Sequence, residues 1–484
     1  MAALRKLALG TLCVPLMLLL SGFFYGTGVN TYNIAGFSGV DCTGVSDSAS
    51  GLQSAINVIP NTSAIFFPTN CTLHLGSTIT ISDRVGLVLA SGIDQRNING
   101  ASAPGFIWVG ANNGVMFDVE HSDHITFSGL TFTTNGTATV NRFIKFDGNP
   151  GVHPGTLATV EHSDFSASSQ TNSSFRAISI SETATQNWEN SYIHDNTIEC
   201  GSGQLATNRA VDGVTNGTTT LTSASAAFVS GDAGKRIRLS LPGFYLDTTI
   251  ASFTNSTTIV LTASAVAHTS VQITTGTNYG TGIYQGASQN AKHSKFYNNQ
   301  INGCDVGIDI EGGSADIRHL GGGFGGRGIY IAAGVVDAII IEQYESEGDL
   351  RGIEIVGGVA PVTIIGSRVT NVNQLADGFF KFGGYVTLLS TATVSAACGA
   401  NTNSVVLGQQ SGGVVLFSAN NQWECTSAQV GYNLLTTLGY VSINDNVDGL
   451  NTSAIRMLGL PASAPGGCAG TGRLWNNSGV LTVC

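Results

Sequence analysis

The stretch Val306-Gly-Ile-Asp-Ile-Glu-Gly-Gly313 returns in altered form at Arg327-Gly-Ile-Tyr-Ile331 and at Arg351-Gly-Ile-Glu-Ile355. Five equivalent glycines are separated by 25, 21, 24 and 26 residues; they are Gly282, Gly307, Gly328, Gly352 and Gly378. A repeat of about 20 to 50 residues is typical of a solenoid. Inside each copy isoleucines alternate with variable residues, which is the period of a strand with one buried face.

Short alternating strands separated by glycines and polar residues fill the remaining chain, and no apolar stripe of helical period is long enough for crossover helices. Parallel strands without such helices predict an all-β parallel β-helix, whose successive turns lie about 4.8 Å apart. Apolar residues form 42% of the chain, enough for a continuous core. The residues predicted to point inward are Ile308, Ile310, Ile329, Ile331, Ile353 and Ile355.

The first 28 residues are predicted to be a signal peptide. Arg5 and Lys6 precede the largely apolar run Leu7–Phe24, the pattern of an export signal. No other segment could span a membrane. Cleavage would remove Cys13 and leave eight cysteines, an even number suited to an oxidising compartment, so we expect a secreted or periplasmic protein.

The repeat pattern divides the mature chain into four parts. Residues 29–210 are predicted to hold an N-terminal cap and the first rungs, and residues 276–450 the remaining rungs. Between them, 211–275 lacks the rung pattern and shows short alternating strands with Gly and Asn turns, which indicates a small inserted β-module. The last part, 451–484, ends in a predicted hairpin that turns at Asn477-Ser-Gly479.

Residues 36–73 carry a motif that resembles the N-terminal signature of the pectate-lyase and polygalacturonase superfamily, shared with phage tailspikes. The matching residues are Asp41, Gly44, Asp47, Gln53, Ala55, Ile56, Phe67 and Pro68. Ser48 replaces the second Asp of the family loop, and Cys42 stands where glycine is common. The resemblance implies a right-handed, single-stranded β-helix whose N-terminal end is closed by a short helix. It leaves the reaction open, because lyases, hydrolases, epimerases and non-enzymatic fibres share the signature.

The residues that alternate with the inward isoleucines are predicted to form the functional surface. Tyr284, Asp309, Tyr330, Glu354 and Phe380 are expected in one outward column, with Glu311 beside Asp309. Spacings of about 10 Å across two rungs and about 7 Å between alternate residues of a strand suit an acid and a base around a water. We therefore predict Asp309, Glu311 and Glu354 as catalytic groups and Tyr284, Tyr330 and Phe380 as sugar-stacking groups. A plain polar face is the alternative.

Two other patterns receive structural interpretations. Val-Glu-His-Ser-Asp occurs at 119–123 and 160–164, where turn residues leading into strands explain the histidines and acids better than a metal or acid-base site does. The run Gly321–Gly326 fits a phosphate-loop spacing but precedes a strand rather than a helix, so we interpret it as a flexible turn. No CxxC pair occurs, so we predict no zinc site and assign no metal-ligating residues, while the sequence leaves any cofactor unknown.

The net charge of the chain limits the classes of ligand that we expect it to bind. A net charge of -11 opposes nucleic acid and polyanionic glycans, and therefore favours a neutral polysaccharide or cell-surface glycan. The hydrolase and calcium-lyase motifs of the superfamily do not occur in rung positions. One hypothesis is an exported protein that binds polysaccharide and, as a hydrolase or lyase, cleaves it. The other is a non-catalytic adhesin or tailspike-like receptor-binding fibre; a trimer would favour the fibre and a monomer the enzyme.

Cys200 and Cys304 are predicted to form a disulfide. Ser191–Cys200 and Ser294–Cys304 align as the same stretch of successive rungs once the inserted module is left out. Neighbouring rungs place equivalent Cα atoms about 4.8 Å apart, within the range of about 4.4 to 6.8 Å for a disulfide. An unbonded pair of buried thiols is the alternative.

Overall fold

The computed structural model describes residues 29–93, 104–148, 155–167, 174–200, 207–233, 235–241, 244–276, 280–323, 326–335, 337–347, 351–358, 360–370, 380–394 and 407–424, together with the strand segments 432–433, 439–443, 446–447, 450–451, 456–458, 474–477 and 480–483. The predicted signal segment lies outside these residues, as do Cys13, Cys398, Cys425, Cys468 and Cys484. Among the described residues, no helix is long and apolar enough to cross a membrane.

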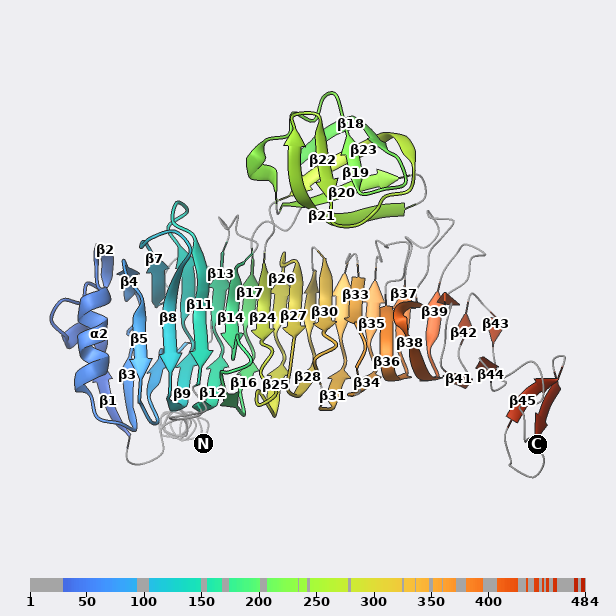
Figure 1. Ribbon diagram of the computed structural model, residues 1–484. Helices are drawn as coiled ribbons and strands as arrows, with labels where there is room; N and C mark the ends of the chain where they lie inside the picture. The colour runs from blue at the N-terminus through green and yellow to red at the C-terminus, as the bar shows by residue number, and fades with distance from the viewer. Residues whose placement is uncertain are drawn as a thin grey trace, which may run out of the picture.

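The body is a right-handed parallel β-helix, as the repeats and the resemblance predicted (Figure 1). Each rung crosses three ladders of parallel strands in turn. The first ladder contains β5 (Ile79–Ser82), β8 (Gly114–Glu120), β11 (Val140–Asp147), β14 (Arg176–Ile180), β24 (Thr281–Gln285), β27 (Val306–Ile310), β30 (Arg327–Ile331), β33 (Arg351–Ile355), β36 (Phe380–Leu389), β38 (Leu407–Ala419) and β40 (Tyr432–Asn433).

The second ladder contains β1 (Asn30–Asn33), β3 (Ser63–Phe66), β6 (Val88–Ala90), β9 (Asp123–Ser128), β12 (Gly155–Glu161), β15 (Trp188–Glu189), β16 (Tyr192–His194), β25 (Ser294–Tyr297), β28 (Ala315–Arg318), β31 (Ile339–Glu342) and β34 (Pro361–Ile365). It continues through the second halves of β36 and β38 to β41 (Gly439–Ile443). The antiparallel β44 (Arg456–Leu458) ends it.

The third ladder contains β2 (Thr43–Asp47), β4 (Thr72–Leu75), β7 (Gly105–Trp108), β10 (Thr131–Thr134), β13 (Asp164–Ser166), β17 (Thr197–Glu199), β26 (Gln300–Asn302), β29 (Gly321–Gly323), β32 (Glu345–Glu347), β35 (Arg368–Thr370), β37 (Ala392–Val394), β39 (Gln422–Glu424) and β42 (Asn446–Val447). The antiparallel β43 (Leu450–Asn451) ends it. The strand β29 corrects the sequence interpretation, because Gly321, Gly322 and Gly323 pair with β26 and do not form a flexible turn.

The core is one continuous stack of inward side chains. The six isoleucines predicted to point inward are all buried. Toward the N-terminal end the stack becomes aromatic; there the Phe132 and Phe165 rings lie parallel with their centroids 4.6 Å apart. These residues occupy successive rungs in register, so the repeat in the sequence becomes a column in space.

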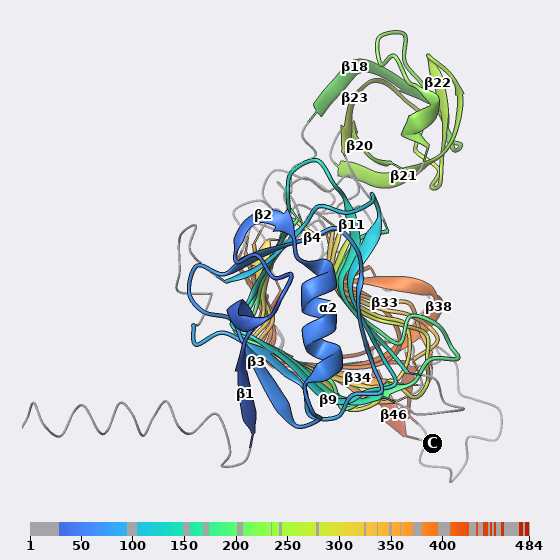
Figure 2. The same cartoon turned by 90° about the vertical axis from the view of Figure 1, so that its left-hand side faces the viewer.

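The helix α2 (Ala49–Val58) covers the N-terminal end of the β-helix, as the resemblance implied (Figure 2). Its buried residues recur with helical spacing and face the core. The side-chain amide of Gln53 exchanges two hydrogen bonds of 2.8 Å with the backbone of Thr80 in β5. Asp47 accepts hydrogen bonds from the backbone N–H groups of Ala49 and Gly76. The signature residues therefore fasten the cap to the first rungs.

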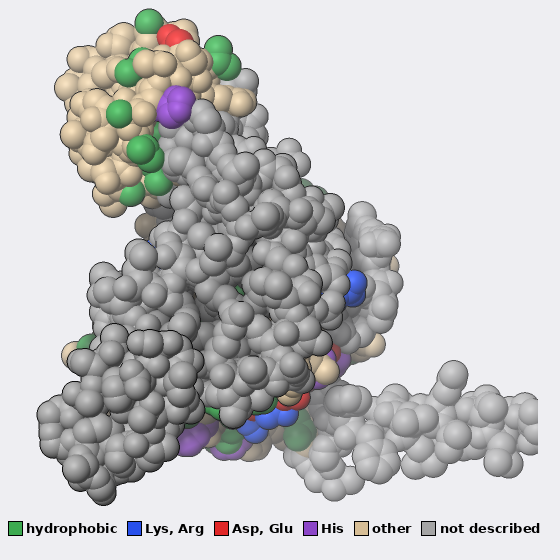
Figure 3. Space-filling model, turned by 90° about the vertical axis from the view of Figure 1, so that its right-hand side faces the viewer, with side chains coloured by type: hydrophobic (Ala, Val, Ile, Leu, Met, Phe, Trp, Pro, Cys, Tyr) green, Lys and Arg blue, Asp and Glu red, His purple; other side chains and the backbone are tan. Residues whose placement is uncertain are grey.

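The predicted inserted module is a closed six-stranded barrel. Its strands are β18 (Thr207–Thr215), β19 (Thr220–Thr222), β20 (Arg236–Leu241), β21 (Phe244–Asn255), β22 (Thr258–Leu261) and β23 (His268–Gly276). It has its own apolar core, which includes Leu221, Ile237 and Ile259. Figure 3 shows that the barrel surface seen from the C-terminal side is mostly uncharged. Closure removes free strand edges, which explains how this module coexists with a solenoid.

Two disulfides join neighbouring rungs. Cys200 and Cys304 are bonded with their Cα atoms 4.8 Å apart, which confirms the predicted pair. The register of β17 and β26 agrees, because Ile198 lies opposite Ile301. Cys42 and Cys71 form the second bond, a pairing that the sequence left open. At the far end, β45 (Leu474–Asn477) and β46 (Val480–Val483) pair antiparallel as a hairpin.

Candidate functional site

The outward column of the first ladder contains most of the predicted site residues. Tyr284 lies opposite Asp309, Asp309 opposite Tyr330, and Tyr330 opposite Glu354. Glu311 follows β27 directly, two residues beyond Asp309. We call the outward surface formed by these five residues the dyad face.

Phe380 does not belong to the dyad face. It lies opposite Ile353, is fully buried and packs in the core, so its prediction as a stacking residue was wrong. Lys381 occupies the outward position opposite Glu354. The alignment on Gly378 misplaced this strand by one residue, and a slip of one residue in a strand moves every side chain to the opposite face.

Asp309 and Glu311 are neighbouring carboxyl groups, two residues apart along the chain. Burial raises the pKa of Asp309 to about 7, and repulsion by Glu311 adds to the rise against the attraction of Arg176 and Arg327. Among the described residues, Oδ1 of Asp309 is buried without a hydrogen-bond partner. A carboxyl group in this setting is protonated near neutral pH, because its charged form would be both desolvated and repelled.

The contact between the two carboxyl groups differs from the spacing that the sequence suggested. An inverting pair leaves about 6.5 to 9.5 Å between its carboxyl groups so that a water fits between them. Asp309 and Glu311 instead lie close enough that repulsion by Glu311 raises the pKa of Asp309. The pKa of Asp309 therefore depends on its neighbour Glu311 as well as on its own burial.

Arginines and a third acid frame this pair of carboxyl groups. The guanidinium carbon of Arg176 lies 3.2 Å from the centre of the Tyr284 ring. Arg142 and Arg176 both form ion pairs with Glu182. Burial opposes ionisation of Glu182, but the hydrogen bond from Arg142 and the charges of both arginines outweigh it and lower the pKa. The sequence did not indicate these residues, because the barrel separates them from β27 along the chain.

Glu354 forms an ion pair with Arg327. It is buried, and Arg327 donates a hydrogen bond to its Oε2. The guanidinium carbon of Arg327 lies 5.0 Å from the centre of the Tyr330 ring. Glu354 therefore orients Arg327 beside Tyr330 and is less suited than Asp309 to carry a proton in a reaction.

A cavity of about 460 Å³ lies farther toward the N-terminus on the first ladder, lined in part by Glu120, His121, Lys145 and Asp147. Burial raises the pKa of Asp147 to about 6 against the attraction of Lys145, with which it forms an ion pair. Lys145 stands in the same outward column as Tyr284, with Ser179 of β14 between them. Polar and ionisable groups thus extend along this ladder beyond the dyad face.

The first Val-Glu-His-Ser-Asp repeat runs from β8 of the first ladder into β9 of the second, and the second repeat runs from β12 of the second ladder into β13 of the third. Asp123 accepts hydrogen bonds from the backbone and hydroxyl groups of Thr156, a structural role. In the second copy, Oε2 of Glu161 lies 3.1 Å from Nε2 of His194, whose Nδ1 lies 2.7 Å from Oδ2 of Asp195. Burial lowers the pKa of His194, but the two carboxylates outweigh it and raise the pKa. In the described part of the chain, no group of three or more His, Cys, Asp or Glu residues could hold a metal ion.

No protein-family model and no curated protein matches the chain. The structure is similar to the A-module of mannuronan C-5 epimerase AlgE4 from Azotobacter vinelandii, at 11% identity and a TM-score of 0.49, covering 86% of this chain and 95% of that one. It is similar to ORF18 of Geobacillus virus E2, at 12% identity and a TM-score of 0.44, covering 94% and 86%. It is also similar to PfbA, a surface adhesin of Streptococcus pneumoniae, at 12% identity and a TM-score of 0.40, covering 94% and 99%. At such identities the likeness concerns the fold alone.

Proposed function

We propose that this protein binds a neutral polysaccharide across the dyad face and hydrolyses a glycosidic bond there, with Asp309 as the general acid. The buried carboxyl group of Asp309 beside Glu311 carries the proposal, because burial and repulsion by Glu311 favour its protonated form up to a pH of about 7. A general acid works best when its pKa lies near the working pH. Burial and a neighbouring carboxyl group are the means by which enzymes produce such a pKa.

The residues around the pair suit a sugar chain. Tyr330 is partly exposed in the rung next to Asp309 and offers a ring on which a sugar can stack. Tyr284 is almost fully buried, so its ring packs against Arg176 and supports the floor of the site. The charge of Glu311 and the acidic balance of the chain oppose a uronate substrate, whose elimination by a lyase would also require its carboxylate to be neutralised.

In the proposed reaction Asp309 donates its proton to the glycosidic oxygen as the bond from that oxygen to the anomeric carbon breaks. A water molecule then supplies a hydroxyl group to the anomeric carbon and gives up its second proton. Glu311 holds the proton on Asp309 before the reaction, and the pair regains one from the water afterwards. Arg327, oriented by Glu354, binds hydroxyl groups of the sugar beside Tyr330.

The test is a screen of the purified protein for release of reducing ends from neutral plant, algal and bacterial polysaccharides. We expect cleavage of at least one, and a fall of about 100-fold or more in kcat for Asp309→Asn, as for loss of a general acid. Asp337→Asn is the matched control, because Asp337 is half-exposed in a turn and its ion pair with Lys292 is long, at 3.6 Å. Equal rates in the Asp309→Asn variant and the natural protein would refute the assignment.

The non-catalytic fibre is the alternative that the same preparation can detect. Binding to a polysaccharide without release of reducing ends, together with a trimer in sedimentation, would favour an adhesin or tailspike-like fibre. We propose export for either case, supported by the two disulfides. Detection of the protein, lacking its first residues, outside the cytoplasm would test this.

A further inference from the structure

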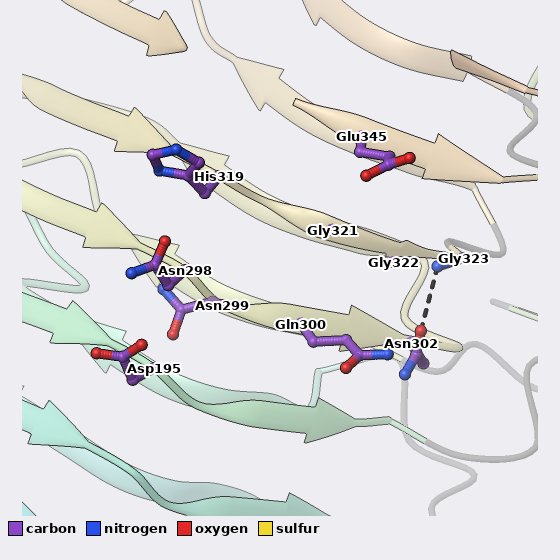
Figure 4. Close-up of a pocket in the computed structure, with 10 residues that line it drawn as sticks. All are labelled: Asp195, Asn298, Asn299, Gln300, Asn302, His319, Gly321, Gly322, Gly323 and Glu345. Carbon is purple, nitrogen blue, oxygen red and sulfur yellow. Dashed lines mark hydrogen bonds between the residues drawn. The ribbon is translucent and has the colours of Figure 1, made fainter. Parts of the chain in front are cut away.

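A groove crosses the third ladder where β29 carries no side chains (Figure 4). Gly321 lies between Gln300 of the preceding rung and Glu345 of the next. Since rungs are about 4.8 Å apart, the two walls stand roughly 10 Å apart. The cavity measures about 680 Å³. We call it the glycine groove.

The fold does not require a glycine at the centre of the groove. A Cβ at Gly321 would meet no heavy atom within 4 Å, whereas one at Gly322 would lie 1.8 Å from the carbonyl oxygen of Ile301. Gly322 is therefore needed for close packing, and Gly321 is not. A glycine inside a strand weakens it relative to alanine, and often marks a place where a ligand approaches the backbone.

The walls present hydrogen-bonding groups of both kinds. Gln300 and Asn302 line one side and Glu345 the other, while Asn298 and His319 close the end nearest the turn (Figure 4). Amide side chains donate and accept, and a carboxylate accepts, so together they can bind neighbouring hydroxyl groups. A small anion is a poor match for a wall with a carboxylate.

The wall formed by β26 is held rigidly. The disulfide between Cys304 and Cys200 anchors its end. Beneath the turn, the buried side chain of Asn299 accepts a hydrogen bond of 3.1 Å from Asn196 and donates one of 2.8 Å to the carbonyl of Ile193. Asn302 accepts a hydrogen bond of 3.2 Å from the N–H of Gly323 across the groove floor. A site preorganised in this way loses little freedom when a ligand binds.

We propose that the glycine groove is a second binding site for a neutral oligosaccharide segment, separate from the dyad face. The proposal rests on the proposed function only for the class of ligand. The groove follows a strand and is open to solvent, as a site for part of a long chain must be. No Phe, Tyr or Trp ring lines it among the described residues, so binding of one segment is weak and acts by holding a polymer that the dyad face also engages.

Filling the groove tests the proposal. Gly321→Val adds a side chain where space is open and suits a strand, so we expect a folded protein with an unchanged thermal transition. Affinity electrophoresis in gels containing galactomannan, laminarin or xylan should show retardation of the natural protein by at least one polymer and about tenfold weaker retardation of the variant. Gly231→Ala, at a barrel glycine with equally open space, is the control and should behave like the natural protein.

A second variant guards against misfolding of the first. Gln300→Ala with Glu345→Ala removes groups from both walls without filling the groove, and we expect a similar loss of retardation. Full retardation of both folded variants would overturn the proposal, as would the absence of retardation of the natural protein in all three gels.

The experiments distinguish a failure of the groove proposal from a failure of the hydrolase proposal. Weaker retardation of Gly321→Val in a protein that cleaves nothing would support the groove and refute the hydrolase. Cleavage that depends on Asp309, combined with full retardation of both groove variants, would refute the groove and support the hydrolase.

Discussion

The dyad face and the glycine groove lie on the same rungs but are built in opposite ways. One turn of the chain supplies both Asp309, in the first ladder, and Gly321, in the third. The dyad face is crowded with ionisable side chains that desolvate and repel or attract one another. The groove is open because side chains are missing. Proton transfer requires a perturbed group in a filled environment, whereas holding a chain requires space between polar walls.

A buried glycine of the first ladder, Gly286, contrasts with Gly321 of the groove. Gly286, which follows β24 on the first ladder, is required by packing, because a Cβ there would lie 2.0 Å from the carbonyl oxygen of Ser181. Gly321 is not required in this way. The first glycine serves the fold, and we attribute the second to binding.

The largest expected effect is the loss of stability when the disulfide that anchors the β26 wall of the groove is removed. Replacing Cys200 and Cys304 by alanine opens a loop of 104 residues and is expected to lower the free energy of unfolding by up to about 4 to 5 kcal/mol. The matched control is the pair Cys42 and Cys71, with a separation of 29, for which about 3 to 4 kcal/mol is expected. Denaturant unfolding measures both. A smaller effect for the longer loop would show that the groove wall does not depend on its disulfide.

The second prediction tests the strand register that places Phe380 in the core and Lys381 on the outward side. Phe380→Ala removes a fully buried ring and is expected to lower the free energy of unfolding by about 3 to 5 kcal/mol. Lys381→Ala, on the outward side of the same strand, is expected to lower it by less than about 1 kcal/mol. If the two variants lose equal free energy of unfolding in denaturant, Phe380 would have to point outward.

The two glycines allow a direct comparison of the surfaces. Gly286→Ala should destabilise the protein by about 1 to 3 kcal/mol, because the new methyl group must displace backbone. Gly321→Ala should leave stability unchanged or raise it by about 0.4 to 1 kcal/mol, since the site is open and alanine limits the unfolded chain. Thermal unfolding of the two variants would show the contrast, and a loss at Gly321 would mean that the fold needs this glycine after all.

The last prediction concerns the pH dependence of stability that Asp309 gives to the dyad face. Between its ordinary pKa of 3.8 and about 7, Asp309 binds more protons in the folded than in the unfolded state, so the free energy of unfolding falls as pH rises through this range. Asp309→Asn cannot ionise. Its stability relative to the natural protein should therefore increase from pH 5 to pH 8, by on the order of 1 to 3 kcal/mol.

Thermal unfolding at the two pH values measures this difference, and a constant difference would refute the raised pKa. Gly321→Val should keep the pH dependence of the natural protein, because the groove lies on another ladder. Cleavage should also decline above about pH 7 as Asp309 loses its proton.

Much of the architecture could be predicted from local pattern. Isoleucines repeated at rung spacing predicted the buried column, and loss of that spacing predicted an inserted β-module, which the structure shows to be a barrel. The aligned cysteines predicted a bond across 104 residues, because a solenoid turns sequence period into distance. The pattern failed at Phe380, where the rung is longer and the glycine no longer marks the strand position.

The sequence by itself determined the class of fold, the cap, the insertion and the outward direction of Asp309 and Tyr330, since each depends on periods and motifs within one or two rungs. Only the tertiary structure decided which groups meet. It placed Arg176 over Tyr284 across the inserted barrel, joined the carboxyl groups of Asp309 and Glu311, and set Gly321 between polar walls. The reason is physical: the pKa of a carboxyl group and the opening of a groove depend on neighbours in three dimensions, and turns of variable length fix those neighbours without leaving a period in the sequence.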